Sequence, residues 1–249
     1  MSIKKNKSLS TGICSLCKIF QPLIKAHIYP RQLYSLFKQF SGNVAPSELV
    51  PFQYSKKSLK IQQWQSGFFD HFILCHGCDN GLFGPWDKYA QNFLARLANA
   101  SNVSDVIDIP SFDYHSLKLF FLSVLWRAAA TTLPFFANVQ FGIWQEKLRA
   151  MLLAKNPGSL EDFSVILVKF EGEFALAMLA PEMVQVHGVQ FYRFRVPGYV
   201  FLVKINSAGL SPDLLPFVIK PNVPLLIGVR RHELTEEYNR LLQFELGES

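Results

Sequence analysis

The chain has 249 residues, enough for one large domain or two small ones with a real hydrophobic core. Hydrophobic residues make up 49% of it and charged residues 18%, a balance that excludes a disordered chain. The net charge of +6 is uneven, because residues 1–100 hold 12 Lys and Arg against 4 Asp and Glu, whereas residues 101–249 hold 13 against 15. A positive segment beside a nearly neutral one suits a polyanion such as nucleic acid, although a solvated lysine-rich surface gives the same count.

The N-terminal residues 2–10 are polar and Lys-rich, which is not the pattern of a secretory signal. We therefore expect a cytoplasmic protein, where paired thiols serve metals more often than disulfides. The best membrane candidate, residues 117–139, is interrupted by Lys118, Arg127 and Pro134, so we expect a buried helix and no membrane association. The 23 phenylalanines indicate an aromatic core or an apolar surface that takes a protein partner or a second copy of the chain.

All four cysteines fall in two Cys-x-x-Cys pairs that are separated by 57 residues, Cys14/Cys17 and Cys75/Cys78. Two such pairs supply the four thiolates of a tetrahedral structural zinc site, each about 2.3 Å from the ion. The long spacing suits a zinc ion that ties together the two ends of a compact unit. A redox pair or unliganded core cysteines are the alternatives, and the presence of two similar pairs disfavours redox use.

Around these pairs, the residue pattern predicts a strand over 22–28 ended by Pro30, a helix over 32–40, a loop over 41–60 and a strand over 68–74. A helix follows over 79–97 or, because of Gly81 and Gly84, begins only at Pro85. We expect this segment, residues 1–100, to form the first of three regions.

The second region, 101–158, reads as helical, with apolar faces along 114–130 and 138–153 and a stop at Asn156-Pro157-Gly158. The third region, 159–249, reads as an antiparallel β-rich region with a closing helix over 232–244. Its expected strands are 163–170, 174–179, 189–196 and 199–205. The fold class predicted from these elements is α+β.

The order of motifs in the first region carries a family resemblance. A Cys-x-x-Cys pair, then Ala26-His27-Ile28-Tyr29-Pro30, then Leu74 followed by the second pair and Asp79-Asn80, resembles the HNH (ββα-metal) nucleases in their zinc-stapled form, over about residues 12–98. The resemblance implies a ββα-metal module and an endonuclease that hydrolyses nucleic-acid phosphodiester bonds, with DNA favoured over RNA. It implies His27 as the general base, since imidazole has an ordinary pKa of about 6.5 and accepts a proton at neutral pH. It also implies a catalytic Mg²⁺ or Mn²⁺ that stabilises the leaving oxygen.

The chain departs from the family pattern at the catalytic metal ligands, which usually come from the residue before the histidine and from the helix after the second cysteine pair. Ala26 precedes His27 and cannot ligate. Asp79 supplies a carboxylate suited to Mg²⁺ or Mn²⁺, Asn80 would orient His27 or help to hold the ion, and Asp87 would join them if the helix is continuous. Helix capping for Asp79 and stabilisation of a helix start for Asp87 are the alternative interpretations.

Two basic residues near His27, Lys25 and Arg31, are candidates for phosphate contacts, with ordinary surface charge as the alternative. His27 itself fits a core histidine as well as a general base. Two hypotheses follow from the sequence. The chain is a metal-dependent HNH-type endonuclease, or it is a catalytically degenerate nucleic-acid-binding or protein-binding subunit, for example of a defence-type assembly.

Overall fold

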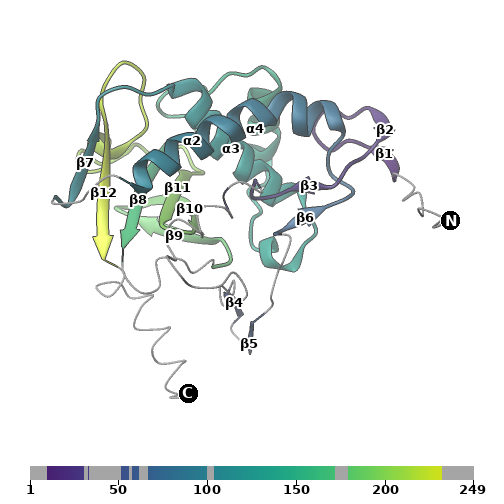
Figure 1. Cartoon of the computed structure of the whole chain (residues 1–249), viewed down its shortest axis with the longest axis horizontal. Helices are drawn as coiled ribbons and strands as arrows, with labels where there is room; N and C mark the ends of the chain where they lie inside the picture. Colours follow the sequence, from purple (N-terminus) through teal and green to yellow (C-terminus); the bar gives the residue numbers. More distant parts are fainter. Residues whose placement is uncertain are drawn as a thin grey trace.

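The computed structural model describes residues 10–30, 33, 52–55, 58–61, 67–99, 104–171 and 179–231. Within these residues the protein is a mixed α+β structure with three α-helices and a six-stranded sheet, which confirms the predicted fold class (Figure 1). The helices are α2 (Gly84–Ala98), α3 (Tyr114–Ala130) and α4 (Ile143–Leu153). The strands of the large sheet are β7 (Val106–Ile109), β8 (Val165–Glu171), β9 (Glu182–Val186), β10 (Val189–Val196), β11 (Tyr199–Lys204) and β12 (Leu225–Arg231).

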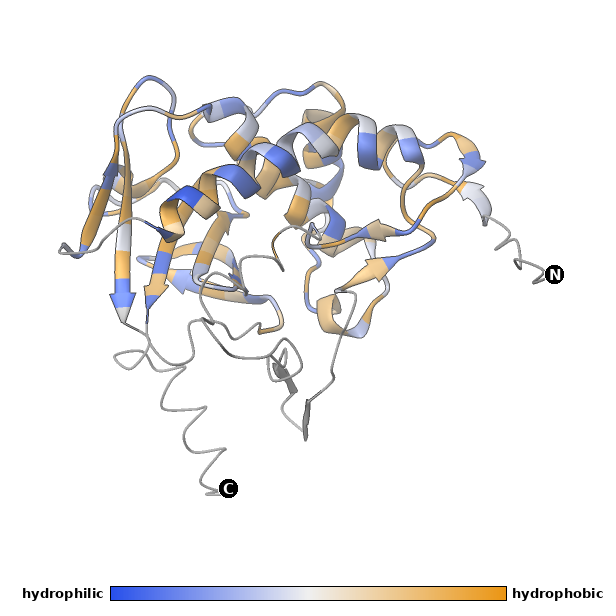
Figure 2. Ribbon diagram, in the orientation of Figure 1, coloured by the Kyte–Doolittle hydropathy of each residue, from blue (hydrophilic) through white to orange (hydrophobic). Residues whose placement is uncertain are grey.

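The large sheet has the order β7-β12-β8-β11-β10-β9. Four of its five pairings are antiparallel, whereas β12 runs parallel to β8, so the prediction of an antiparallel region was wrong at this pair. Hydrophobic residues predominate along β8 and β11 (Figure 2). In β10 the two-residue alternation places Tyr192 and Phe194 in the main core and directs Arg193 and Arg195 to the opposite face.

Helix α3 is the central helix of the structure and packs against α2, α4 and β11 (Figure 1). Its first turn is capped by Asp113, whose carboxylate accepts a hydrogen bond from the backbone N of Ser116 at 3.0 Å. Nearly the whole helix from Leu117 to Ala128 is buried, as the apolar run in the sequence predicts. In the part of the chain that the structure describes, no helix is both long and apolar enough to span a lipid bilayer.

Among its described residues, the N-terminal segment forms six short strands before its helix. Strand β3 (Ala26–His27) pairs antiparallel with β6 (Phe69–Asp70), with Ala26 opposite Asp70 and His27 opposite Phe69. The chain then passes the second cysteine pair and enters a π-helical turn, η2 (Gly77–Phe83), which runs directly into α2. The helical segment therefore begins before Pro85, and Gly81 and Gly84 do not interrupt it.

Buried residues from each of the three expected regions join in one cluster that extends from Cys14 to Ile227. Tyr29 is at the junction, with ring centroids 6.1 Å from Phe68, 5.4 Å from Phe136 and 6.4 Å from Phe194. Side chains from the cysteine-bearing segment, from the link after α3 and from β10 thus share one core.

Several elements differ from the sequence prediction. Strands β4 (Phe52–Ser55) and β5 (Ser58–Ile61) pair within the stretch that was expected to be a loop. Strands β7, β9 and β12 were not predicted, and the expected strand over 22–28 is divided between β2 (Phe20–Pro22) and β3. The expected helix over 32–40 apart from Leu33, the expected helix over 232–244, and most of the expected strand over 174–179 lie outside the described residues.

The turn after α4 requires glycine at position 158. Gly158 has φ +74°, and a Cβ there would lie 2.7 Å from Met151 Cε and 2.8 Å from Asp162 Cβ. We expect Gly158→Ala to lower the free energy of unfolding by about 1–3 kcal/mol, because a left-handed residue with a Cβ costs about 1–2 kcal/mol before any crowding. Urea denaturation measures this loss, with Gly209→Ala as the control because a Cβ there meets open space. Equal stability of the two variants would contradict the prediction.

Candidate functional site

The four cysteines come together at one point. Their sulfur atoms all lie within 4.8 Å of one another, and none of the four forms a disulfide. A tetrahedral ion about 2.3 Å from each sulfur requires sulfur–sulfur separations of about 3.8 Å, so only small shifts would bring the cluster to this geometry. Four close thiols are the donor set of a structural metal such as zinc, and the prediction that Cys14, Cys17, Cys75 and Cys78 form one such site fits this arrangement.

Backbone hydrogen bonds set the two cysteine pairs in place. The first pair occupies the turn between β1 (Thr11–Ile13) and β2, where Lys18 N donates to Cys14 O at 2.8 Å and Lys18 adopts φ 63°. The second pair opens η2, where Asp79 N donates to Cys75 O at 3.0 Å. A bond of 2.9 Å from Ser15 N to Ile73 O joins the two segments directly. Residues 58 positions apart in the chain therefore meet in a fixed register.

The electrostatics of the cluster also fit a cation. Cys14 and Cys75 are almost fully buried, and Gln21 Nε2 lies 3.3 Å from Cys17 Sγ as a hydrogen-bond donor. The hydrogen bond between Cys14 and Cys78 lowers the pKa of the Cys14 thiol and raises that of Cys78, since the pair shares one proton. Packed thiols of this kind are stabilised when a metal ion replaces their protons.

His27 lies on β3 and is half-buried. Its ring centroid is 6.2 Å from that of Phe69 on β6, and Lys25 Nζ lies 3.6 Å from the centre of the same Phe69 ring. The structure therefore brings Lys25 and His27 to one side of the strand pair, where both contact Phe69. Arg31, the other candidate for a phosphate contact, lies outside the described residues.

The acidic candidates lie on the helical segment after the second cysteine pair. Asp79 is half-buried in η2, Asn80 beside it is exposed, and Asp87 is in the first turn of α2. Burial raises the pKa of Asp79 to about 6, with the charge of Arg127 opposing that rise and the charge of Asp87 adding to it. The helical segment that carries Asp79 and Asp87 is continuous, which was the condition that the sequence set for Asp87 to join the site.

Arg127 of α3 connects these parts and was not identified from the sequence as a site residue. Its guanidinium forms two hydrogen bonds to the Asp87 carboxylate, at 2.8 and 3.1 Å, and a third of 3.2 Å from Nη1 to the backbone oxygen of His27. Ser123, one turn earlier, accepts bonds from Nε and Nη2 at 3.3 and 2.9 Å. Arg127 is 1% exposed, and an arginine inside an apolar helix is the only signal of this role that the sequence offers.

Ala26 is fully buried, and its antiparallel partner Asp70 is the carboxylate nearest to it in register. Asp70 accepts hydrogen bonds from Thr131 Oγ1 at 2.7 Å and from the backbone N of Phe72 at 2.8 Å. Residues 26 and 70 therefore point to the interior, whereas His27 and Phe69 point to the other side of the strand pair. The Asp70 carboxylate, opposite Ala26, therefore connects β6 to Thr131 at the end of α3.

No protein-family model matches this chain, and neither comparison with curated proteins nor comparison with solved structures gives a significant match. The geometry of the two sites is therefore the basis for a functional assignment. One site is the four-cysteine cluster. The other is a set of residues linked through Arg127, whose guanidinium bonds the backbone oxygen of His27 and the Asp87 carboxylate.

Proposed function

We propose that this chain is a nucleic-acid phosphodiester hydrolase of the zinc-stapled ββα-metal (HNH-like) type, with His27 as its general base. One observation carries the proposal. The strand that bears His27 pairs antiparallel with β6, and β6 leads through the second cysteine pair into the helical segment that bears Asp79. The cysteine cluster holds the start of that helical segment against the turn between β1 and β2. In the proposal the cluster is structural and the chemistry belongs to the neighbouring residues.

The proposed reaction is hydrolysis of a phosphodiester. The His27 imidazole accepts a proton from a water molecule, and the water oxygen forms a bond to phosphorus as the bond to the leaving sugar oxygen breaks and that oxygen takes a proton from solvent. Lys25, which is exposed on the same side of β3, places a positive charge where it can contact the phosphate. We propose the same role, contact with the substrate phosphate, for Arg31. Arg127 holds the backbone of His27 and thereby positions the base.

The proposal includes a divalent ion, Mg²⁺ or Mn²⁺, and the donor set for it is small. Ala26 offers no ligand atom, and both carboxylate oxygens of Asp87 bind Arg127, which leaves Asp79 and Asn80. Magnesium ions usually keep several waters and take one or two carboxylates plus substrate phosphate, so this set is sufficient. When bound, the ion would stabilise negative charge on the leaving oxygen.

A second candidate function is nucleic-acid or protein binding without turnover. The bidentate ion pair between Asp87 and Arg127 favours it, because a carboxylate whose charge is already matched attracts a divalent ion weakly. The buried Ala26 adds to this, since the position before the histidine supplies a ligand in the nucleases that the sequence resembles. This alternative predicts salt-sensitive binding of nucleic acid and no cleavage.

Nicking of supercoiled plasmid in the presence of Mg²⁺ or Mn²⁺ separates the two functions. We expect the native protein to nick and His27→Ala to lose at least about 100-fold in rate, since a general base contributes about 10²–10⁴-fold. His115→Ala is the matched control, because His115 is an exposed histidine on the first turn of α3. Nicking that persists in His27→Ala contradicts the assignment of the base. A native protein that binds DNA without cleaving it supports the second function.

A further inference from the structure

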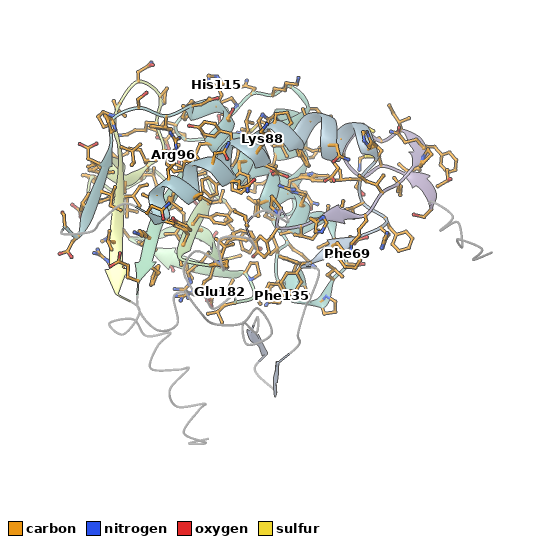
Figure 3. All side chains as sticks on the ribbon, in the orientation of Figure 1. Phe69, Lys88, Arg96, His115, Phe135 and Glu182 are labelled. Atoms are coloured by element: carbon orange, nitrogen blue, oxygen red, sulfur yellow. The ribbon has the colours of Figure 1, made fainter. Side chains whose placement is uncertain are left out.

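The outer side of the β3–β6 pair carries a row of aromatic rings. The ring centroids lie 6.2 Å apart for His27 and Phe69, 5.3 Å for Phe69 and His71, and 6.5 Å for His71 and Phe72. Phe69 lies on the side of β6 away from α2 (Figure 3). We call the surface formed by these four rings together with Lys25 the aromatic face.

The aromatic face is accessible from solvent. Phe72 is 68% exposed, Lys25 is exposed, and the three other rings are half-buried. A single exposed phenylalanine is ordinary on a protein surface and carries no argument. Four adjoining rings that pack edge to face, with an ammonium group 3.6 Å from the centre of the Phe69 ring, are a different arrangement, because they combine aromatic surface with a positive charge.

These properties match one class of partner. Aromatic rings along a basic surface bind unpaired nucleotides, because each base can stack on a ring while cations contact the phosphates. In a duplex the base faces are covered by neighbouring bases, and only the edges and the backbone can be reached. The surplus of eight positive charges in residues 1–100 supplies the attraction to phosphate.

We propose that the aromatic face binds single-stranded DNA by stacking of its bases. The inference rests on the proposed function and deepens it, because the face includes His27 and the bound strand would therefore pass the general base. Phe72 lies at the end of the row farthest from His27, with His71 between it and Phe69. A base would stack on Phe72 there. The substrate is then an unpaired strand or an unpaired stretch within a duplex.

The test measures binding, so it does not depend on cleavage. Fluorescence anisotropy with a labelled oligothymidylate of about 12 nucleotides, at low salt and without divalent ions, gives the affinity of the full-length protein. We expect Phe72→Ala and Phe69→Leu each to weaken binding about tenfold, since stacking of one base on an aromatic ring contributes on that scale. Phe69→Leu keeps an apolar side chain in a half-buried position. Phe20→Ala is the matched control, because Phe20 is 70% exposed but lies on the β1–β2 hairpin.

Each outcome decides a separate claim. Unchanged binding by both variants, an equal loss in Phe20→Ala, or tighter binding of a duplex of the same length would overturn the proposal. RNA of the corresponding sequence is expected to bind no more tightly than the DNA, and tighter RNA binding would overturn the choice of DNA. Binding that depends on Phe72 in a protein that never cleaves contradicts the proposed hydrolase and leaves the aromatic face in place. Cleavage that requires His27 but not Phe72 or Phe69 supports the proposed hydrolase and contradicts binding of the substrate by the aromatic face.

Discussion

Cys75→Ser is expected to abolish zinc binding and to unfold the N-terminal segment of the protein. The sulfur of Cys75 is one of four within 4.8 Å of one another, and serine offers no thiolate to replace it. Structural zinc contributes an apparent binding free energy of about 10–16 kcal/mol, and this energy is part of the folding free energy. The loss should extend beyond the cysteines, because Cys14 and Cys75 belong to the same buried cluster as residues of α3 and β10.

Elemental analysis and thermal unfolding measure the two parts of this prediction. The native protein should hold about one zinc ion per chain, and the variant should hold close to none. Ser15→Ala is the control, since Ser15 lies inside the first cysteine pair but is not a ligand in the expected site. Full stability of Cys75→Ser, or a native protein without zinc that melts in one cooperative transition, would refute the structural role of the cluster.

Arg127→Met is expected to cost about 3–5 kcal/mol of folding free energy, the largest effect that we predict for a residue outside the cysteine cluster. The substitution leaves the half-buried Asp87 carboxylate without its cation. Burial already raises the pKa of Asp87, and the charge of Arg127 opposes that rise, so loss of Arg127 should shift the carboxylate further toward its neutral form. The backbone oxygen of His27 also loses its donor.

A double variant tests whether the cost comes from the unpaired charge. Arg127→Met combined with Asp87→Leu should recover most of the lost stability, because a buried ion pair can be exchanged for apolar side chains of similar volume at little cost. Urea denaturation of the two single variants and the double variant gives the coupling free energy. If the double variant loses as much free energy of unfolding as the two single variants together, the ion pair is not the source of the effect.

The parts of the fold that sequence reasoning could predict are those with a strong local signal. The two Cys-x-x-Cys pairs predict a shared site from spacing alone, and their sulfurs meet as expected. Strand β10 occupies the predicted residues, Val189–Val196, because a run of aromatic and β-branched residues bounded by turn signals is read directly from the sequence. Helix α3 follows from one long apolar run that is capped by Asp113.

The parts that could not be predicted depend on long-range contacts. Nothing local to Val106–Ile109 indicates that it pairs with Leu225–Arg231, because each is a short run whose partner is distant in sequence. The role of Arg127 could not be predicted either, because it too depends on contacts with residues that are distant in sequence. Within an apolar helix it reads as an interruption, and only the packing of α3 against α2 and β3 brings it to Asp87 and the backbone of His27.

The pairing of β7 with β12 has a consequence for synthesis of the protein. Strand β7 ends at Ile109, but its neighbour β12 begins only at Leu225, so almost half of the chain must leave the ribosome between them. At translation rates of about 5–20 residues per second, this interval lasts roughly 6–23 seconds. For that time the backbone donors and acceptors of β7 have no strand partner from β12, and an unpaired strand is a template for wrong association. Binding of a chaperone to the nascent chain would be most useful in this interval.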